Sequence, residues 1–286
     1  MTKPICERGK KKMKVDVMVN TYNSEKYLEQ CLVNIYKNIP VRKLFVIDNF
    51  SEDYTVKIAE KFNAEIIQTK ASLAEARAIG FKLVKTKLFV NVDSDVVLPS
   101  NWFNRVMNYW NNNKIGCIWG IPIHESALHR AYQTSMFKFR NPCAYHIPHL
   151  ANMIARKDLL EDIVFPAQMK LGAVAGEDYW IMRWIEQKGF ICKNVPVYCK
   201  HYSYPSPLGT KAFWGGASVR LLKRKKLHHL IRQVLLSFPQ GVFTASISRN
   251  PYVIPYWVRY RFEELYGFLH WDKYFSLKRA FEIKKC

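Results

Sequence analysis

The stretch Leu88-Phe-Val-Asn-Val-Asp-Ser-Asp-Val-Val-Leu98 is the most informative segment of this sequence. Its β-branched and aromatic residues predict a buried strand that ends in two carboxylates one residue apart, Asp93 and Asp95. In an open α/β sheet, ligands bind at the carboxyl ends of the strands. Two acids placed there offer hard oxygen donors that suit Mg²⁺ or Mn²⁺ with a phosphate. The motif is short, however, and an Asp that caps a polar turn would also explain it.

Strand and helix patterns alternate on the amino-terminal side of this stretch. Short apolar runs at 14–20, 44–47 and 65–68 predict strands, and amphipathic segments lie between them. This alternation predicts an α/β fold with a Rossmann-like, mostly parallel sheet flanked by helices and joined by right-handed crossovers.

The expected strand ends place Thr21, Asp48 and Asp93 along one rim of the sheet, which is the geometry of a nucleotide site. The chain has no Gly-rich phosphate loop of the G-x-G-x-x-G or G-x-x-x-x-G-K type. A pyrophosphate must therefore be held in another way, and a metal ion on Asp95 would hold it.

Polar residues mark the starts of two expected helices. Ser51 is expected to cap a helix whose first turn begins with two acidic residues. Ser72 and Glu75 have the spacing of a capping box and are expected to open a helix that ends near Val84.

A helix and three strands are expected after the Asp-x-Asp stretch. The helix is 99–113, and the strands are 115–123, 152–155 and 190–198. Pro196 favours a sheet edge for the last strand, because proline cannot donate a ladder hydrogen bond. The segment 124–149 is rich in aromatic residues, Arg and His, and we expect a loop and short helix around a cleft.

A second group of chemically active residues lies further along the chain. Gly176-Glu177-Asp178 places two acids at the start of a helix, where they would complement the helix dipole or supply a general base. His201 follows the last expected strand and would add an imidazole to the same metal, although a surface histidine also fits this position.

Five short motifs, in this order and spacing, resemble those of the family 2 glycosyltransferases, which have the GT-A fold. The motifs are Val15-Asp-Val-Met-Val-Asn-Thr-Tyr-Asn23, Val46-Ile-Asp-Asn-Phe-Ser-Glu-Asp53, Ala76-Arg-Ala-Ile-Gly80, Asp93-Ser-Asp95 and Gly176-Glu-Asp178. The resemblance covers Lys14 to Ser203. Asn20 stands where a proline is usual, and Ala78 stands where an asparagine is usual.

The resemblance implies a role for individual residues. The implied nucleotide-binding residues are Thr21, Tyr22, Asn23, Asp48 at the nucleobase, Arg77 and Asp93. The implied ligands of Mn²⁺ or Mg²⁺ are Asp93, Asp95 and His201. The implied catalytic residues are Asp178, as the general base, and Glu177.

The expected function is therefore metal-dependent transfer of a sugar from a nucleotide-diphospho-sugar donor to a glycan or lipid-phosphate acceptor, such as a polyprenyl phosphate, with inversion. The alternatives are a nucleic-acid-binding protein on an α/β scaffold, suggested by the net charge of +21, and a nucleotidyltransferase. Acids gathered at strand ends argue against a nucleic-acid groove, so no nucleic-acid partner is expected. The turn at 21–24 has no glycine, which argues against a nucleotidyltransferase.

Composition and the resemblance together divide the chain into three parts. They are a basic tail at 1–13, a catalytic domain at 14–205 for which the resemblance implies the GT-A fold, and a basic, aromatic-rich, amphipathic helical region at 206–286. The last region holds 15 Lys and Arg against 4 Asp and Glu. This composition predicts attachment to an anionic membrane surface. Helices packed on the catalytic domain with a solvated basic face, or a single-stranded nucleic-acid site, would also explain it.

The seven cysteines are scattered without C-x-x-C spacing, so we expect reduced thiols. The first residues lack the apolar core of a signal peptide, and no run of about 18 apolar residues is present. We therefore expect a cytoplasmic protein, peripheral on the cytosolic face of a membrane.

Overall fold

The computed structural model describes residues 13–125, 130, 150–166, 169, 176–202, 208–221 and 225–271. The expected basic tail at 1–13 and the expected loop at 124–149 lie almost entirely outside these residues.

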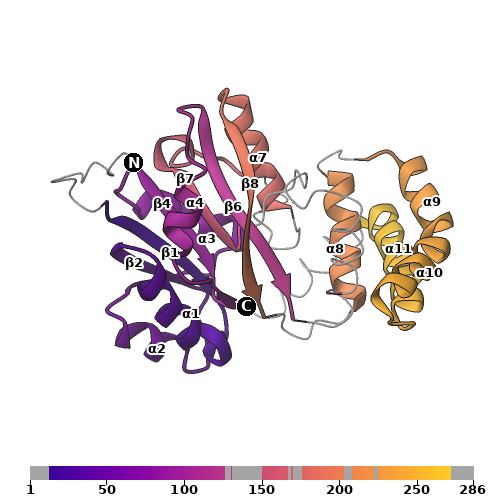
Figure 1. The fold of residues 1–286 in the computed structure, drawn as a ribbon, viewed down its shortest axis with the longest axis horizontal. Helices are drawn as coiled ribbons and strands as arrows, with labels where there is room; N and C mark the ends of the chain where they lie inside the picture. The colour runs from indigo at the N-terminus through magenta and orange to yellow at the C-terminus, as the bar shows by residue number, and fades with distance from the viewer. Residues whose placement is uncertain are drawn as a thin grey trace, which may run out of the picture.

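The catalytic region is built on an eight-stranded sheet of order β3-β2-β1-β4-β7-β6-β8-β5 (Figure 1). The strands are β1 (Val15–Thr21), β2 (Val41–Asp48), β3 (Glu65–Gln68), β4 (Leu88–Asp93), β5 (Val96–Val97), β6 (Ile115–His124), β7 (Asn152–Arg156) and β8 (Ile191–His201). Strands β3, β2, β1 and β4 are mutually parallel, and β6 is parallel to β8. Strand β7 runs antiparallel between β4 and β6, and β5 runs antiparallel to β8. The prediction of a mostly parallel α/β sheet is confirmed.

Helices cover both faces of this sheet. They are α1 (Glu25–Asn38), α2 (Thr55–Lys61), α3 (Leu73–Leu83), α4 (Trp102–Met107) and α7 (Glu177–Gln187). Alternate residues of β1 enter two separate apolar clusters, Val17 and Val19 on the side of α1, α2 and α4, and Met18 on the side of α3 and α7. Because successive side chains of a strand point to opposite faces, a continuous apolar run is what a strand needs in a sheet that is buried on both faces.

The capping box at the start of α3 is confirmed. The Ser72 hydroxyl accepts from the Glu75 backbone N–H, and the Glu75 carboxylate accepts from the Ser72 N–H at 3.1 Å. We expect Ser72→Ala to lower the free energy of unfolding by about 1 kcal/mol, because one N–H at the helix start loses its partner. Chemical denaturation measures this loss, and Ser100→Ala, at an exposed turn, is the control that should change little.

Two expected helix bounds are wrong. Ser51 does not cap α2, which begins at Thr55 after Tyr54, because the Ser51 hydroxyl and N–H both donate to Asp48 instead. The helix expected at 99–113 is limited to α4, and an asparagine-rich stretch follows it. In that stretch the Asn112 side chain accepts from the Lys114 N–H, a local bond that competes with helix.

Strand β8 continues to His201, three residues further than expected. Pro196 lies where the β6–β8 register shifts, and β5 pairs only with Lys200 and His201. The Pro196 section of β8 therefore has β6 as its sole strand partner within the described chain, in agreement with the edge position expected for a proline.

Four helices follow the sheet region and form a helical unit beside it (Figure 1). They are α8 (Leu208–Leu221), α9 (Leu227–Leu235), α10 (Ser237–Ser248) and α11 (Val253–Leu269). Helices α8 and α11 approach closely, since a Cβ on Gly267 would lie 2.1 Å from the Phe213 carbonyl oxygen. Within the described residues, no helix is both long and apolar enough to cross a bilayer.

Candidate active site

Strands β1 and β2 bring Thr21 and Asp48 side by side at their carboxyl ends. Asp48 is fully buried, and both of its carboxylate oxygens accept hydrogen bonds. The donors are Thr21 Oγ1 at 2.9 Å, Ser51 N at 2.9 Å, Ser51 Oγ at 2.5 Å and Gln68 Nε2 at 3.3 Å. Asp48 therefore ties three segments of the rim together.

The turn after β1 is joined to the turn after β2 by reciprocal hydrogen bonds. The Asn23 N–H donates to Ser51 Oγ, and Asn23 Oδ1 accepts from the Glu52 N–H, both at 2.9 Å. Asn23 has a left-handed backbone, with φ of 46°, which asparagine tolerates better than most residues. Tyr22 projects from this turn and is exposed.

Arg77 links two of the predicted acidic groups from the buried face of α3. Its side chain is 4% exposed, and it donates to Glu177 Oε1 at 2.8 Å and to Asp93 Oδ1 at 3.2 Å. Burial lowers the pKa of Arg77, but the charges of Asp93, Glu177 and Asp178 outweigh it, so the pKa is raised. The guanidinium is therefore a permanent cation between β4 and α7.

Asp95 and His201 meet where β5 pairs with β8. The antiparallel β5–β8 pair places Val96 opposite His201, and the His201 Nε2 lies 3.1 Å from Asp95 Oδ1. The Asp95 carbonyl also accepts from the Tyr202 N–H at 2.9 Å. The His124 ring lies 4.7 Å from the His201 ring. Sequence reasoning missed Tyr202, because strand β5 has only two residues, too few to give a period. It missed His124 because the pairing of β6 with β8, which places His124 opposite His201, joins segments far apart in the sequence.

Glu177 and Asp178 open helix α7 with different environments. Glu177 is oriented by Arg77 and by the Gly176 N–H at 3.0 Å, and Gly176 has φ of 120°, a conformation that L side chains rarely adopt. The half-buried Asp178 carboxylate accepts from the Tyr179 N–H at 2.9 Å. The helix start thus holds one carboxylate fixed against a cation and a second beside it.

The predicted metal ligands are only partly assembled. Asp95 and His201 face one another and present carboxylate oxygen and imidazole nitrogen, donors that suit Mn²⁺ or Mg²⁺. Asp93 is directed to Arg77 instead. In the described parts of the chain, no three His, Cys, Asp or Glu side chains gather closely enough to hold a metal ion. The pair is compatible with a metal whose other ligands come from a bound diphosphate.

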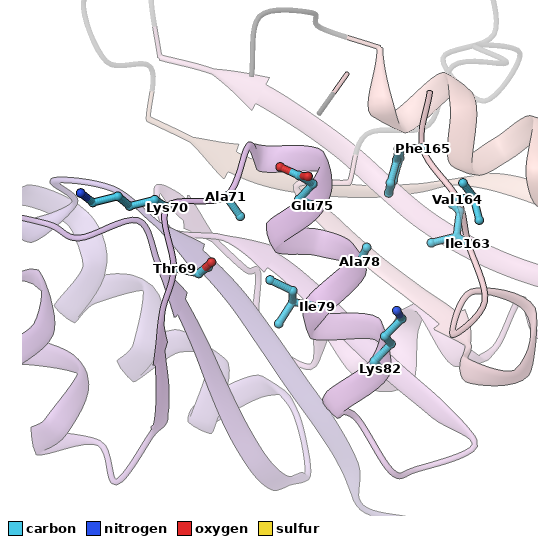
Figure 2. Close-up of a pocket in the computed structure, with 10 residues that line it drawn as sticks. All are labelled: Thr69, Lys70, Ala71, Glu75, Ala78, Ile79, Lys82, Ile163, Val164 and Phe165. Carbon is cyan, nitrogen blue, oxygen red and sulfur yellow. The ribbon is translucent and has the colours of Figure 1, made fainter. Parts of the chain in front are cut away.

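A cavity of about 500 Å³ follows the outer side of α3 (Figure 2). Glu75, Ile79 and Lys82 of α3 line one side, and Ile163 and Phe165 line another. The residues at 69–71, which follow β3, close one end. None of the predicted site residues lines this cavity, because Arg77 points to the opposite face of α3.

The sheet order and the charged side chains at its strand ends define an α/β enzyme of the GT-A type. The family model for glycosyl transferase family 2 matches residues 16–169, and the chain belongs to this family. It is therefore a glycosyltransferase, as the sequence motifs predicted.

Two solved structures illustrate the similarity of fold. The mannosyltransferase PcManGT from Pyrobaculum calidifontis, in complex with GDP-Man and Mn²⁺, is 16% identical with a TM-score of 0.58, over 87% of this chain and 74% of that one. Glucosyl-3-phosphoglycerate synthase from Mycobacterium tuberculosis, in complex with Mn²⁺, UDP and glucosyl-3-phosphoglycerate, is 17% identical with a TM-score of 0.54, over 74% and 79%. No curated protein sequence is significantly similar to this chain.

Proposed function

We propose that this protein transfers a sugar from a nucleoside diphosphate sugar to an acceptor in a reaction that requires Mn²⁺ or Mg²⁺. The observation that carries the proposal is the convergence of Asp95, His201 and the Arg77 network at adjoining strand ends of a family 2 chain. The mannosyltransferase and the glucosyl-3-phosphoglycerate synthase, whose structures contain nucleotides and Mn²⁺, support it by analogy.

The nucleotide would lie across the carboxyl ends of β1, β2 and β4. The joined turns at Thr21–Asn23 and Asp48–Ser51 would bind the nucleoside, with Asp48 holding the turn in shape. Asp95 and His201 would hold the metal, with Asp93 at the ribose or at the metal. A bound divalent ion would neutralise the charge that develops on the diphosphate leaving group.

Asp178 would accept the proton from an acceptor hydroxyl as that oxygen attacks the anomeric carbon. Glu177, held by Arg77, would fix the start of α7 and thus the position of Asp178. A single direct displacement of this kind inverts the anomeric centre. A phosphate acceptor is already ionised, so with it Asp178 would mainly orient the attacking oxygen.

We propose a lipid-phosphate acceptor and a peripheral position on an anionic membrane surface. The basic helical region supports this setting, because only four acidic residues accompany its 15 basic ones. A glycan acceptor in solution is the alternative, and transfer assays with water-soluble and lipid-linked acceptors separate the two.

Thermal unfolding with a panel of nucleoside diphosphates, with and without Mn²⁺, tests the proposal. One nucleotide at about a hundredfold excess over its Kd should stabilise the protein by about 2.7 kcal/mol, which raises Tm by about 5–10 °C, and only when Mn²⁺ is present. Asp95→Ala should abolish the Mn²⁺-dependent part of the shift. Glu161→Gln, which removes an exposed acid outside the site, is the matched control and should leave it intact. Equal shifts with and without Mn²⁺ would refute the metal site.

A further inference from the structure

Helices α9 and α10 carry a continuous stripe of exposed apolar side chains. The stripe consists of Leu227, Ile231, Leu235, Phe238 and Val242. These residues recur at intervals of three or four, the spacing of one helix face. Helical hydrogen bonding continues across the junction, since Leu236 N donates to Arg232 O and Gln240 N donates to Leu236 O, both at 3.0 Å. The α9–α10 stripe is therefore one surface.

The opposite face of α9 and α10 packs against the helical unit. Leu230 is buried in a cluster with Val219 and Phe268. A Cβ on Gly241 would lie 3.0 Å from the Cα of Ile254, so α10 is tightly apposed to α11. Figure 1 shows α9 and α10 at the edge of the molecule farthest from the sheet. The α9–α10 stripe thus faces outward and is not an internal contact surface.

The charge around the α9–α10 stripe has a single sign. The sequence contains no Asp or Glu between Gln187 and Phe262. Lys226, Arg232 and Arg249 are exposed beside the stripe. Among the described residues, the observed ion pairs include none of these three cations. Apolar side chains beside uncompensated cations match the boundary between acyl chains and anionic head groups.

Helix α11 has a different surface, although its aromatic residues first suggested membrane contact. Trp257 is buried, and the Arg261 guanidinium lies 4.7 Å from its ring centre. Phe262 and Leu269 are 56% and 48% exposed, but the partly exposed carboxylate of Glu263, paired with Arg259, lies on the same helix, and Glu264 is buried. Aromatic content therefore does not mark the contact surface in this unit.

We propose that the α9–α10 stripe is the surface through which this protein inserts into an anionic lipid bilayer. The inference names the surface that would hold the proposed enzyme on a membrane. It rests on the proposed function only for the expectation that the enzyme works at an anionic membrane. A second copy of the chain is a poorer occupant, because two stripes would bring like cations together without acids to balance them. A nucleic acid would engage the cations but leave the apolar stripe in water.

Co-sedimentation of the full chain with vesicles tests this proposal. Binding is expected to vesicles that contain phosphatidylglycerol, to weaken at high salt, and to be much weaker with phosphatidylcholine alone. The double variant Leu235→Gln/Phe238→Gln, at positions 73% and 62% exposed, should bind these vesicles at least about tenfold more weakly than the parent. Phe262→Gln/Leu269→Gln is the matched control, since it also replaces one exposed Leu and one exposed Phe, and it should bind as the parent does.

Three outcomes would overturn the proposal. They are unchanged vesicle binding by the α9–α10 variant, equal weakening by both double variants, and a switch from dimer to monomer in the α9–α10 variant without vesicle binding by the parent. The Mn²⁺-dependent nucleotide shift is measured on the same samples and should be unchanged in both variants. Its absence in the parent would refute the proposed function, while the vesicle comparison would still decide the membrane surface.

Discussion

Arg77→Ala is expected to lower the free energy of unfolding by about 3–5 kcal/mol and to reduce sugar transfer by about 100-fold. Arg77 is a buried cation that contacts Asp93 at 3.2 Å and Glu177 at 2.8 Å. Its removal takes the guanidinium partner from Asp93 and Glu177, and it removes a cation that interacts favourably with the charge of Asp178. The start of α7 would then shift, and Asp178 with it. Arg77 thus acts as a positioning residue whose loss affects stability and transfer together.

Two further variants separate this effect from a general loss of positive charge. Arg183→Ala removes an exposed cation that pairs with Glu186 on α7, and it should cost less than about 1 kcal/mol. Arg77→Lys keeps the charge but loses the planar fork that reaches two acids at once, so it should recover stability only in part. Urea denaturation and initial transfer rates are the measurements. An Arg77→Ala protein with the stability and kcat of the parent would contradict the role assigned to this network.

The strand ends were predictable because each strand is a short apolar run followed at once by a polar residue. Asp48 and Asp93 stand at the ends of β2 and β4 as the pattern indicated. Their partners were not predictable in the same way. Arg77 and Glu177 are 100 residues apart in the chain and meet only because α3 and α7 cover the same face of the sheet.

The Asp95–His201 contact could not be predicted from local sequence patterns. It depends on β5, a strand of only two residues that forms by pairing with the distant strand β8. The Ser51 misassignment has a related cause. A serine before two acids is a good cap by propensity, but the buried Asp48 carboxylate offers its hydroxyl and N–H a stronger, charge-assisted bond. Tertiary contacts therefore override local preference at the rim of the site.

Asp178→Asn is expected to reduce kcat for a hydroxyl acceptor by about 10²–10⁴-fold with little change in stability. The amide keeps the shape of the side chain, and its oxygen can still accept from the Tyr179 N–H, but it cannot take a proton. The Mn²⁺-dependent nucleotide shift should remain, because the proposed role of Asp178 is toward the acceptor hydroxyl and not toward the metal. Asp162→Asn, which alters an exposed carboxylate paired with Lys188, is the matched control and should leave kcat unchanged.

The acceptor class decides how large the Asp178→Asn effect becomes. A hydroxyl must lose its proton as it attacks, whereas a phosphate oxygen is already ionised near neutral pH and needs orientation rather than a base. Initial rates with the donor that the nucleotide panel identifies, measured with hydroxyl and lipid-phosphate acceptors, should therefore show a much larger loss for the hydroxyl. Full activity of Asp178→Asn with a hydroxyl acceptor would exclude Asp178 as the base. The half-buried Glu177, already engaged by Arg77, would then be the carboxylate to test at the start of α7.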